Sequence, residues 1–195
     1  MRIFFAVFPE SAAVEKLAAL IATLTKRCPS DEIRWVVPEQ LHYTLKFLGE
    51  QPEARVSDAI AAARRAARSC SPFDIVVGGL GAFPSAERPR VVWVGTSAGG
   101  PVLVELSARL DGELERVGFA KEARPFVPHL TLARTKTRQA EQAAVRGLAK
   151  VGEVGDVARI RVDRFVLMQS QLSPKGATYT VVESFPLAEA DSPSP

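Results

Sequence analysis

The stretch "LHYTLKFLGE" at residues 41–50 has a counterpart in "PHLTLARTK" at residues 128–136. Each contains the same unit, called a His frame below: a histidine, any residue, a threonine and a leucine. His42 and His129 are the only two histidines in the chain. Since residues i and i+2 of a β-strand point to the same side, each frame should present an imidazole and a hydroxyl together, backed by apolar residues. One frame alone indicates little, whereas two frames that use every histidine indicate a paired site.

The order of expected elements around the two His frames also repeats. In each half a strand, a helix, the His-bearing strand, a second helix and another strand follow one another, and a further strand opens the next half or closes the chain. Phe73 follows His42 by 31 residues (73 − 42), as Ile160 follows His129 (160 − 129). Two units are too few for a solenoid array, so the repeat predicts two pseudo-symmetric lobes.

The expected fold class is α+β, with two pseudo-symmetric lobes that each consist of an antiparallel sheet with helices on its outer face. The active-site cleft should lie between the two sheets. Residues 1–187 should form this single bilobal domain, and residues 188–195, which are mostly small or polar, should be a disordered tail. A loop or hairpin is expected over 79–89, where Gly and Pro interrupt the pattern, and one long strand over 158–170.

Composition argues against several classes of protein. The 195-residue chain has a formal net charge of +3, a mild basic bias that fits an anionic ligand without establishing one. Cys28 and Cys70 do not cluster with the histidines, so we expect no metal, no other cofactor and a reduced, cytoplasmic protein. The apolar start at 2–8 ends at Pro9 and is too short for a secretory or membrane-spanning segment, so no membrane partner is expected. Nothing in the sequence indicates more than a monomer.

Two imidazoles on either side of one point suit acid–base chemistry. One can take a proton from an attacking oxygen while the other gives a proton to the leaving oxygen, because an unperturbed histidine pKa of about 6.5 allows either role near neutral pH. Each such transfer is typically worth about 10²–10⁴ in rate. The hydroxyls of Thr44 and Thr131 can donate hydrogen bonds to the non-bridging oxygens of a phosphate held between them. The residues alone leave open which histidine is the acid.

Longer stretches carry a resemblance to a known family. They are "MRIFFAVFP", "RWVVPEQLHYTLKFLGE", "GAFPSAERPRVVWVG", "GFAKEARPFVPHLTLAR" and "SQLSPKGATYTVV". With the two His frames they resemble the 2H phosphoesterase superfamily, and within it the bacterial RNA 2′,3′-cyclic phosphodiesterases, also called 2′–5′ RNA ligases. The resemblance covers nearly the whole chain up to about residue 187, and neither frame departs from the family pattern at its His or Thr.

The resemblance implies a role for each matching residue. His42 would be the proton donor and His129 the proton acceptor, and Thr44 and Thr131 would hold the phosphate. The implied activity is metal-independent hydrolysis of RNA or nucleoside 2′,3′-cyclic phosphates to 2′-phosphomonoesters, with reversible 2′–5′ RNA ligation as a second activity. The implied partners are RNA ends or nucleotides that carry a 2′,3′-cyclic phosphate.

The fifth residue after each histidine is Phe47 in the first frame and Arg134 in the second. The resemblance suggests that Arg134 contacts the phosphate and Phe47 packs against the base, which suits a guanidinium and an aromatic ring. Strict alternation would place both on the wrong side, so these roles need a strand end or a bulge after each frame. Otherwise Phe47 is a core residue and Arg134 a solvated cation. Lys46 shares the histidine's face by parity and is a weaker phosphate candidate, and Trp35 and Trp93 are expected in the core.

Three functions stay open at this point. The first is the cyclic phosphodiesterase just described. The second keeps the chemistry and changes the substrate to another small cyclic phosphate or a 2′–5′ oligonucleotide. The third is a non-catalytic module that binds nucleotides or RNA ends. Two intact histidines count against the third, because binding alone does not require two titratable groups.

Overall fold

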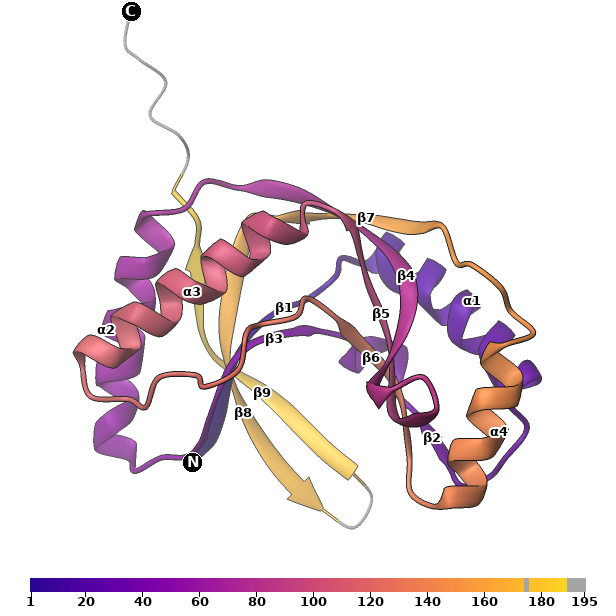
Figure 1. Ribbon diagram of the computed structural model, residues 1–195. Coiled ribbons are helices and arrows are strands. Elements are labelled where there is room, and N and C mark those ends of the chain that lie inside the picture. The colour runs from indigo at the N-terminus through magenta and orange to yellow at the C-terminus, as the bar shows by residue number, and fades with distance from the viewer. Residues whose placement is uncertain (174–175, 189–195) are drawn as a thin grey trace, which may run out of the picture.

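The computed structural model describes residues 1–173 and 176–188. Apart from Ala188, the expected disordered tail lies outside the described residues. The elements in chain order are β1 (Arg2–Val7), α1 (Ser11–Arg27), β2 (Ile33–Trp35), the 3₁₀ turn η1 (Pro38–Gln40), β3 (Tyr43–Glu50), α2 (Glu53–Arg68), β4 (Phe73–Ser85), β5 (Arg88–Ala98), α3 (Gly100–Arg116), β6 (Leu130–Thr135), α4 (Arg138–Leu148), β7 (Asp156–Val162), β8 (Arg164–Ser173) and β9 (Gly176–Pro186) (Figure 1). No helix in this part of the chain is both long and apolar enough to cross a bilayer.

The strands form one antiparallel sheet in the order β7-β4-β5-β6-β3-β1-β8-β9, with β2 added alongside β6. A single residue pair, Tyr43 with Leu130, joins β3 to β6 at the middle of this order. The sheet therefore divides into a first lobe (β3, β1, β8, β9) and a second lobe (β7, β4, β5, β6, β2). The α+β class is confirmed, and the two expected sheets are the two halves of one sheet joined at this pair.

Two helices cover each lobe. Helices α2 and α3 pack against each other over the first lobe, and α1 and α4 lie together over the second, where α1 also packs against β7 (Figure 1). The buried stripe of α3 has helical spacing, as the sequence predicts: Leu103, Leu106, Leu110 and Leu114. The buried side of α2 consists mainly of alanines, and these small side chains let α2 approach its neighbours closely. The helices keep to the outer faces and leave the junction of the lobes open.

Much of the segment expected as a loop or hairpin over 79–89 is strand. β4 and β5 form a long hairpin that turns only at Ala86 and Glu87. Gly81 in β4 serves packing rather than turning, because a Cβ added to it would overlap the ring of Trp93. In a sequence taken alone, glycine indicates a turn. The sequence does not show that Trp93 lies across from Gly81 and leaves no room for a side chain there.

The single strand expected over 158–170 is broken at Asp163. β7 before the break pairs with β4 in the second lobe, and β8 after it pairs with β1 and β9 in the first lobe. The break is held by a backbone hydrogen bond from Leu187 N to Asp163 O of 2.8 Å. The alternation of buried residues slips by one position here, from Ile160 and Val162 to Phe165 and Leu167. This slip indicates a break in the strand, but it does not reveal that the chain changes lobes there.

Candidate active site

A β-bulge follows the first His frame. In the ladder between β1 and β3, Ala6 pairs with Thr44 and Phe5 pairs with Lys46, which leaves Leu45 as the extra residue. Leu45 and Lys46 are consequently both buried, and Phe47 is exposed. Since one extra residue reverses the alternation of faces, Phe47 returns to the side of the frame's histidine and threonine.

The second His frame has a bulge at the equivalent position. Trp93 of β5 pairs with Thr131 and Val92 pairs with Ala133, so Leu132 is the extra residue. Leu132 and Ala133 are both fully buried, while Arg134 is exposed. Phe47 and Arg134 could reach the site only if a strand end or a bulge followed each histidine. Both frames have such a bulge, at the third residue after the histidine.

The same bulge overturns the phosphate-binding prediction for Lys46. Its side chain is only 5% exposed and points away from the histidine, into an ion pair with Asp111 of α3 (Nζ to Oδ1, 2.6 Å) and a hydrogen bond to Ala120 O (2.8 Å). The prediction was wrong because it assumed unbroken alternation along β3.

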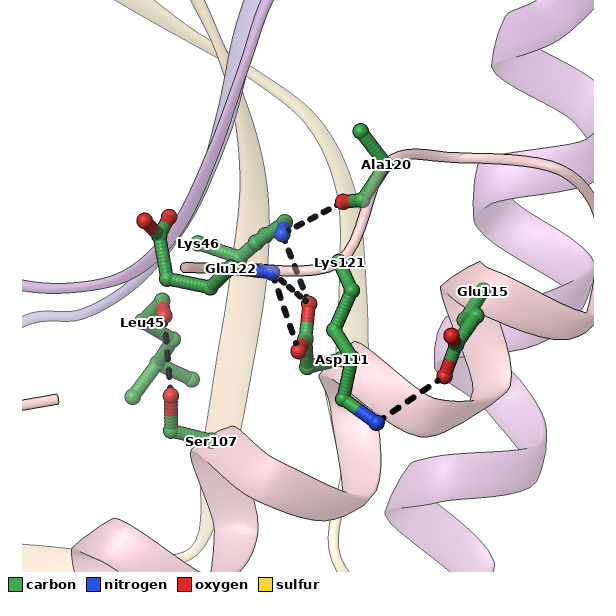
Figure 2. A network of polar contacts seen from close by, with 8 residues as sticks. All are labelled: Leu45, Lys46, Ser107, Asp111, Glu115, Ala120, Lys121 and Glu122. Atoms are coloured by element: carbon green, nitrogen blue, oxygen red, sulfur yellow. Dashed lines mark hydrogen bonds and ion pairs between the residues drawn. The ribbon is translucent and has the colours of Figure 1, made fainter. Parts of the chain in front are cut away.

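Helix α3 fixes this bulge with two side chains one turn apart (Figure 2). Ser107 Oγ donates to the carbonyl of Leu45 (2.9 Å), and Asp111 holds the ammonium of Lys46. Asp111 also accepts from the backbone N–H of Glu122 at 3.3 Å (Oδ1) and 3.2 Å (Oδ2). One carboxylate therefore ties the first His frame to the segment that leads into the second.

The pair that joins the lobes consists of equivalent residues. Tyr43 and Leu130 each directly follow the histidine of their own frame, and they pair antiparallel. An antiparallel register centred on this pair sets His42 opposite Thr131 and Thr44 opposite His129. The pseudo-twofold axis therefore passes through the junction, and the two His frames meet across it.

One cavity of about 690 Å³ receives all six predicted site residues. They are His42, Thr44, Phe47, His129, Thr131 and Arg134. The cavity lies at the junction of the two lobes and is also lined by the β8–β9 hairpin, through residues such as Ser170 and Tyr179. Of the two tryptophans expected in the core, Trp35 is half-buried and lines this cavity, and Trp93 is half-buried beside His129.

Both histidines are held in the same tautomer by the same contact. His42 Nδ1 lies 2.7 Å from Gln40 O, and His129 Nδ1 lies 2.7 Å from Val127 O, so each ring binds the carbonyl two residues earlier. A carbonyl oxygen only accepts, hence each Nδ1 carries the proton and each Nε2 is left free to exchange one. Gln40 is itself fixed by a 3.1 Å hydrogen bond from its Nε2 to Ala177 O in β9.

Each imidazole stands among aromatic rings. Phe4, Phe8 and Tyr179 surround His42, with ring centroids at 5.1, 5.3 and 5.4 Å. Phe83 and Trp93 flank His129 at 5.0 and 6.1 Å. These rings restrict each imidazole to one orientation and withhold water from its faces.

Burial lowers the pKa of both histidines below the ordinary value near 6.5. For His42 the hydrogen bond to Gln40 O opposes this effect, and repulsion from His129 and Arg134 lowers the pKa further. For His129 the hydrogen bond to Val127 O opposes the effect of burial, and Arg134 again lowers the pKa. The free protein therefore holds the pair less protonated at neutral pH than two ordinary histidines would be.

Three cations give the cavity a positive field. Arg134 on β6 is the direct pairing partner of Arg34 on β2, and Arg2 lies over the ring of Phe47 at 4.7 Å. All three line the cavity, and within the described residues none has a carboxylate within 4.0 Å. Guanidinium groups without carboxylate partners are suited to bind a phosphate.

Sequence reasoning did not identify Arg2, Arg34 or the rings around the histidines as part of the site. Phe4 and Tyr179 reach His42 from strands at opposite ends of the sequence, and Arg34 reaches Arg134 only through the short strand β2. One signal was present: Gln40 and Val127 occupy equivalent places two residues before each histidine. Both residues bind the histidine's Nδ1 through the backbone carbonyl, however, and any residue supplies a carbonyl, so their identity in the sequence does not reveal this role.

Two His frames that face one basic cavity across a pseudo-twofold α+β fold define a phosphoesterase of the two-histidine class. The family model described as LigT-like phosphoesterase matches the chain twice, over residues 7–93 and 94–179. The matches begin 87 residues apart (94 − 7), as do the two histidines (129 − 42). The chain belongs to the LigT-like phosphoesterase family, and the internal repeat expected from the sequence is confirmed.

Relatives and solved structures agree with this assignment. An RNA 2′,3′-cyclic phosphodiesterase of Thermus thermophilus is 38% identical over 96% of this chain and 90% of its own. One from Methanothermobacter thermautotrophicus is 32% identical over 96% and 99%. The crystal structure of a Thermus thermophilus protein superposes with a TM-score of 0.79, at 33% identity over 97% and 99% of the two chains. Escherichia coli LigT complexed with 3′-AMP gives 0.78, at 26% identity over 96% and 98%.

Proposed function

We propose that this protein is a phosphodiesterase that hydrolyses 2′,3′-cyclic phosphates on RNA ends or nucleosides to 2′-phosphomonoesters. The observation that carries the proposal is the pair of histidines with Nδ1 bound to a backbone carbonyl and Nε2 free, both lining one basic cavity. The relatives named RNA 2′,3′-cyclic phosphodiesterase support the choice of substrate.

In the proposed reaction His129 Nε2 takes a proton from a water molecule, whose oxygen attacks the phosphorus. The bond between phosphorus and the 3′ oxygen breaks, and His42 gives that oxygen its proton. Thr44 and Thr131 donate hydrogen bonds to the non-bridging oxygens, while Arg134 neutralises the charge that builds on them. Phe47 stacks on the base. Both histidines have the same geometry, so the assignment of acid and base rests on the family resemblance alone.

The same site supports 2′–5′ RNA ligation as a second activity. If the 5′-hydroxyl of an RNA replaces water, the attack on phosphorus forms a 2′–5′ phosphodiester instead of a monoester. The reverse step cleaves that linkage with the two histidines in exchanged roles. Neither direction needs a cofactor, because the only groups transferred are protons and the phosphoryl group.

Both His frames come from one chain and together line the cavity, so we propose that the protein acts as a monomer. Cys28 and Cys70 are free thiols in the structure, which supports a reducing, cytoplasmic setting.

Product analysis tests the proposed function. The protein is incubated, with and without EDTA, with a nucleoside 2′,3′-cyclic phosphate and with an RNA that ends in one, and the products are separated by chromatography. We expect a 2′-phosphomonoester from both substrates and no loss of rate in EDTA. A 3′-phosphomonoester would contradict the proposed regiochemistry, and inactivation by EDTA would contradict the proposal that the reaction is independent of metal ions. Tight binding of 2′-nucleotides without turnover would favour the binding module. Turnover of only a 2′–5′ oligonucleotide or another cyclic phosphate would favour the alternative substrates.

The pH profile of kcat/KM provides a further prediction. Activity from the free enzyme needs one histidine protonated and one neutral, and both pKa values are lowered from 6.5, so the maximum should fall below pH 6.5. Arg134→Gln removes a positive charge that lowers both pKa values, so it should shift the maximum to higher pH while reducing its height. Arg2→Gln is the matched control, because Arg2 also lines the cavity but is not one of the charges that lower the pKa of His42 or His129. A maximum that stays in place in Arg134→Gln, or moves to lower pH, would contradict this account.

A further inference from the structure

A second cavity, of about 770 Å³, lies in the second lobe, on the side of the sheet that α4 covers. It is formed by the start of β5 and the turn before it, the end of β6 and the first turns of α4. Its lining residues are Glu87, Arg88, Arg90, Thr135, Lys136, Arg138, Glu141 and Gln142. Neither His frame contributes to it.

Cations dominate this second cavity. Four of its side chains are basic and two are acidic, and Glu141 is already engaged by Arg90 (Nε to Oε1, 3.4 Å). Arg88, Lys136 and Arg138 have no carboxylate within 4.0 Å in the part of the chain that the structure describes. Three cations without such partners around one hollow repel one another, and an anion bound between them would relieve that repulsion.

The two cavities open on opposite faces of β6 and are lined by successive residues at the end of this strand, because Ala133 packs against α4 and the side chains of a strand alternate between its faces. Arg134 lines the active-site cavity, and the next two residues, Thr135 and Lys136, line the second. β6 ends at Thr135, so Lys136 lies just past the strand and Arg138 is the first residue of α4. Successive Cα atoms are about 3.8 Å apart, so at most about 15 Å separates the Cα atoms of Arg134 and Arg138. A row of positive charge therefore runs from the active site, around the end of β6, to the second cavity.

We propose that the second cavity binds the sugar–phosphate backbone of an RNA chain whose 3′-terminal nucleotide occupies the active site. The inference rests on the proposed function and narrows its substrate class to RNA oligonucleotides in preference to free nucleotides. A chain that extends in the 5′ direction carries a phosphate at every nucleotide, and the row of cations offers successive partners for these phosphates. Contacts of this kind fix the position of a strand without reading its bases, so the second cavity adds affinity and little sequence preference.

A triple variant separates the second cavity from the active site. Arg88→Gln, Lys136→Gln and Arg138→Gln are combined, and kcat/KM is measured on a nucleoside 2′,3′-cyclic phosphate and on a ten-nucleotide RNA with the same 3′ end. We expect kcat/KM for the RNA to fall about tenfold at low salt, and that for the nucleotide to stay within about twofold. Each lost phosphate contact is worth about 0.7 in the slope of log affinity against log salt, so the slope for RNA should flatten by up to about 2.

A second triple variant, Lys16→Gln, Lys26→Gln and Arg68→Gln, is the matched control. It removes the same charge from exposed positions on α1 and α2 that line neither cavity. An RNA-specific loss in the first variant alone supports the proposal, whereas equal losses in both variants, or none in either, overturn it.

If the wild type turns over neither substrate, the proposed function fails and the second cavity is judged by binding. The fluorescence anisotropy of a labelled ten-nucleotide RNA with a 3′-phosphate is then titrated with each protein. Weaker binding by the first variant than by the control keeps the RNA site, and equal binding overturns it.

Discussion

Replacing either histidine by alanine is expected to lower kcat on a 2′,3′-cyclic phosphate by about 10²–10⁴. Each imidazole is locked in one tautomer with a free Nε2 at the cavity, so its removal eliminates one of the two proposed proton transfers. The double variant should lose little more than the worse single variant, because the two groups act as one unit. Full activity in His42→Ala or in His129→Ala would refute the two-histidine mechanism.

The pH profiles of the same variants assign the acid and the base. A base must be neutral to act and produces the acidic limb of the profile, whereas an acid must be protonated and produces the alkaline limb. If the proposed roles are right, His129→Ala loses the acidic limb and His42→Ala loses the alkaline limb, and the opposite result would exchange the roles. Phe8→Leu is a suitable control, because it alters the packing around His42 while keeping both imidazoles.

Asp111→Ala is expected to lower the free energy of unfolding by roughly 3 kcal/mol, which is the lower end of the range for breaking a buried ion pair. The side chain of Lys46 is 5% exposed, and among the described residues its ammonium would keep the carbonyl of Ala120 as its one remaining partner. The low end applies because Asp111 is itself 13% exposed, so some water can reach the vacated position. Urea denaturation followed by circular dichroism measures the loss.

Two further variants make the Asp111 prediction specific. Glu115→Ala breaks the neighbouring pair with Lys121, whose side chains are 50% and 66% exposed, and should cost less than about 1 kcal/mol (Figure 2). Lys46→Met combined with Asp111→Leu removes both charges and should recover most of the lost stability, because no ion is then left unpaired. Equal losses in Asp111→Ala and in this double variant would show that packing, not the unpaired ammonium, accounts for the cost.

The α+β class and the histidine and threonine of each His frame could be predicted because the sequence contains the pattern twice. A single His-x-Thr in a strand is ambiguous, whereas a second copy at the same place in a repeated unit implies a symmetry that brings both copies together. Phe47 and Arg134 were expected in the site from the family resemblance, on the condition that a strand end or a bulge follows each frame, and a bulge is present in both.

The remaining features depend on contacts between distant parts of the chain. The prediction for Lys46 was wrong because the sequence near β3 does not indicate which residue forms the bulge. The bulge is bound by Ser107 and Asp111 of α3, which lie more than 60 residues later in the chain. The rings around His42 likewise come from β1, the residues just after it and β9. The break at Asp163 follows from pairing each side of it with a different lobe, which hydrophobic periodicity along one segment does not encode.

The lobes of the molecule and the repeats of its sequence divide the chain differently. Helix α1 and strand β4 of the first repeat belong to the second lobe, while α3 and β8 of the second repeat belong to the first lobe. Neither repeat therefore encodes a complete lobe. A chain cut between the repeats would yield two fragments, and in each of them both lobes would lack some of their strands and one of their two helices. The protein should unfold in a single cooperative transition. An ancestor with one repeat could have assembled this cleft only by exchanging segments within a homodimer.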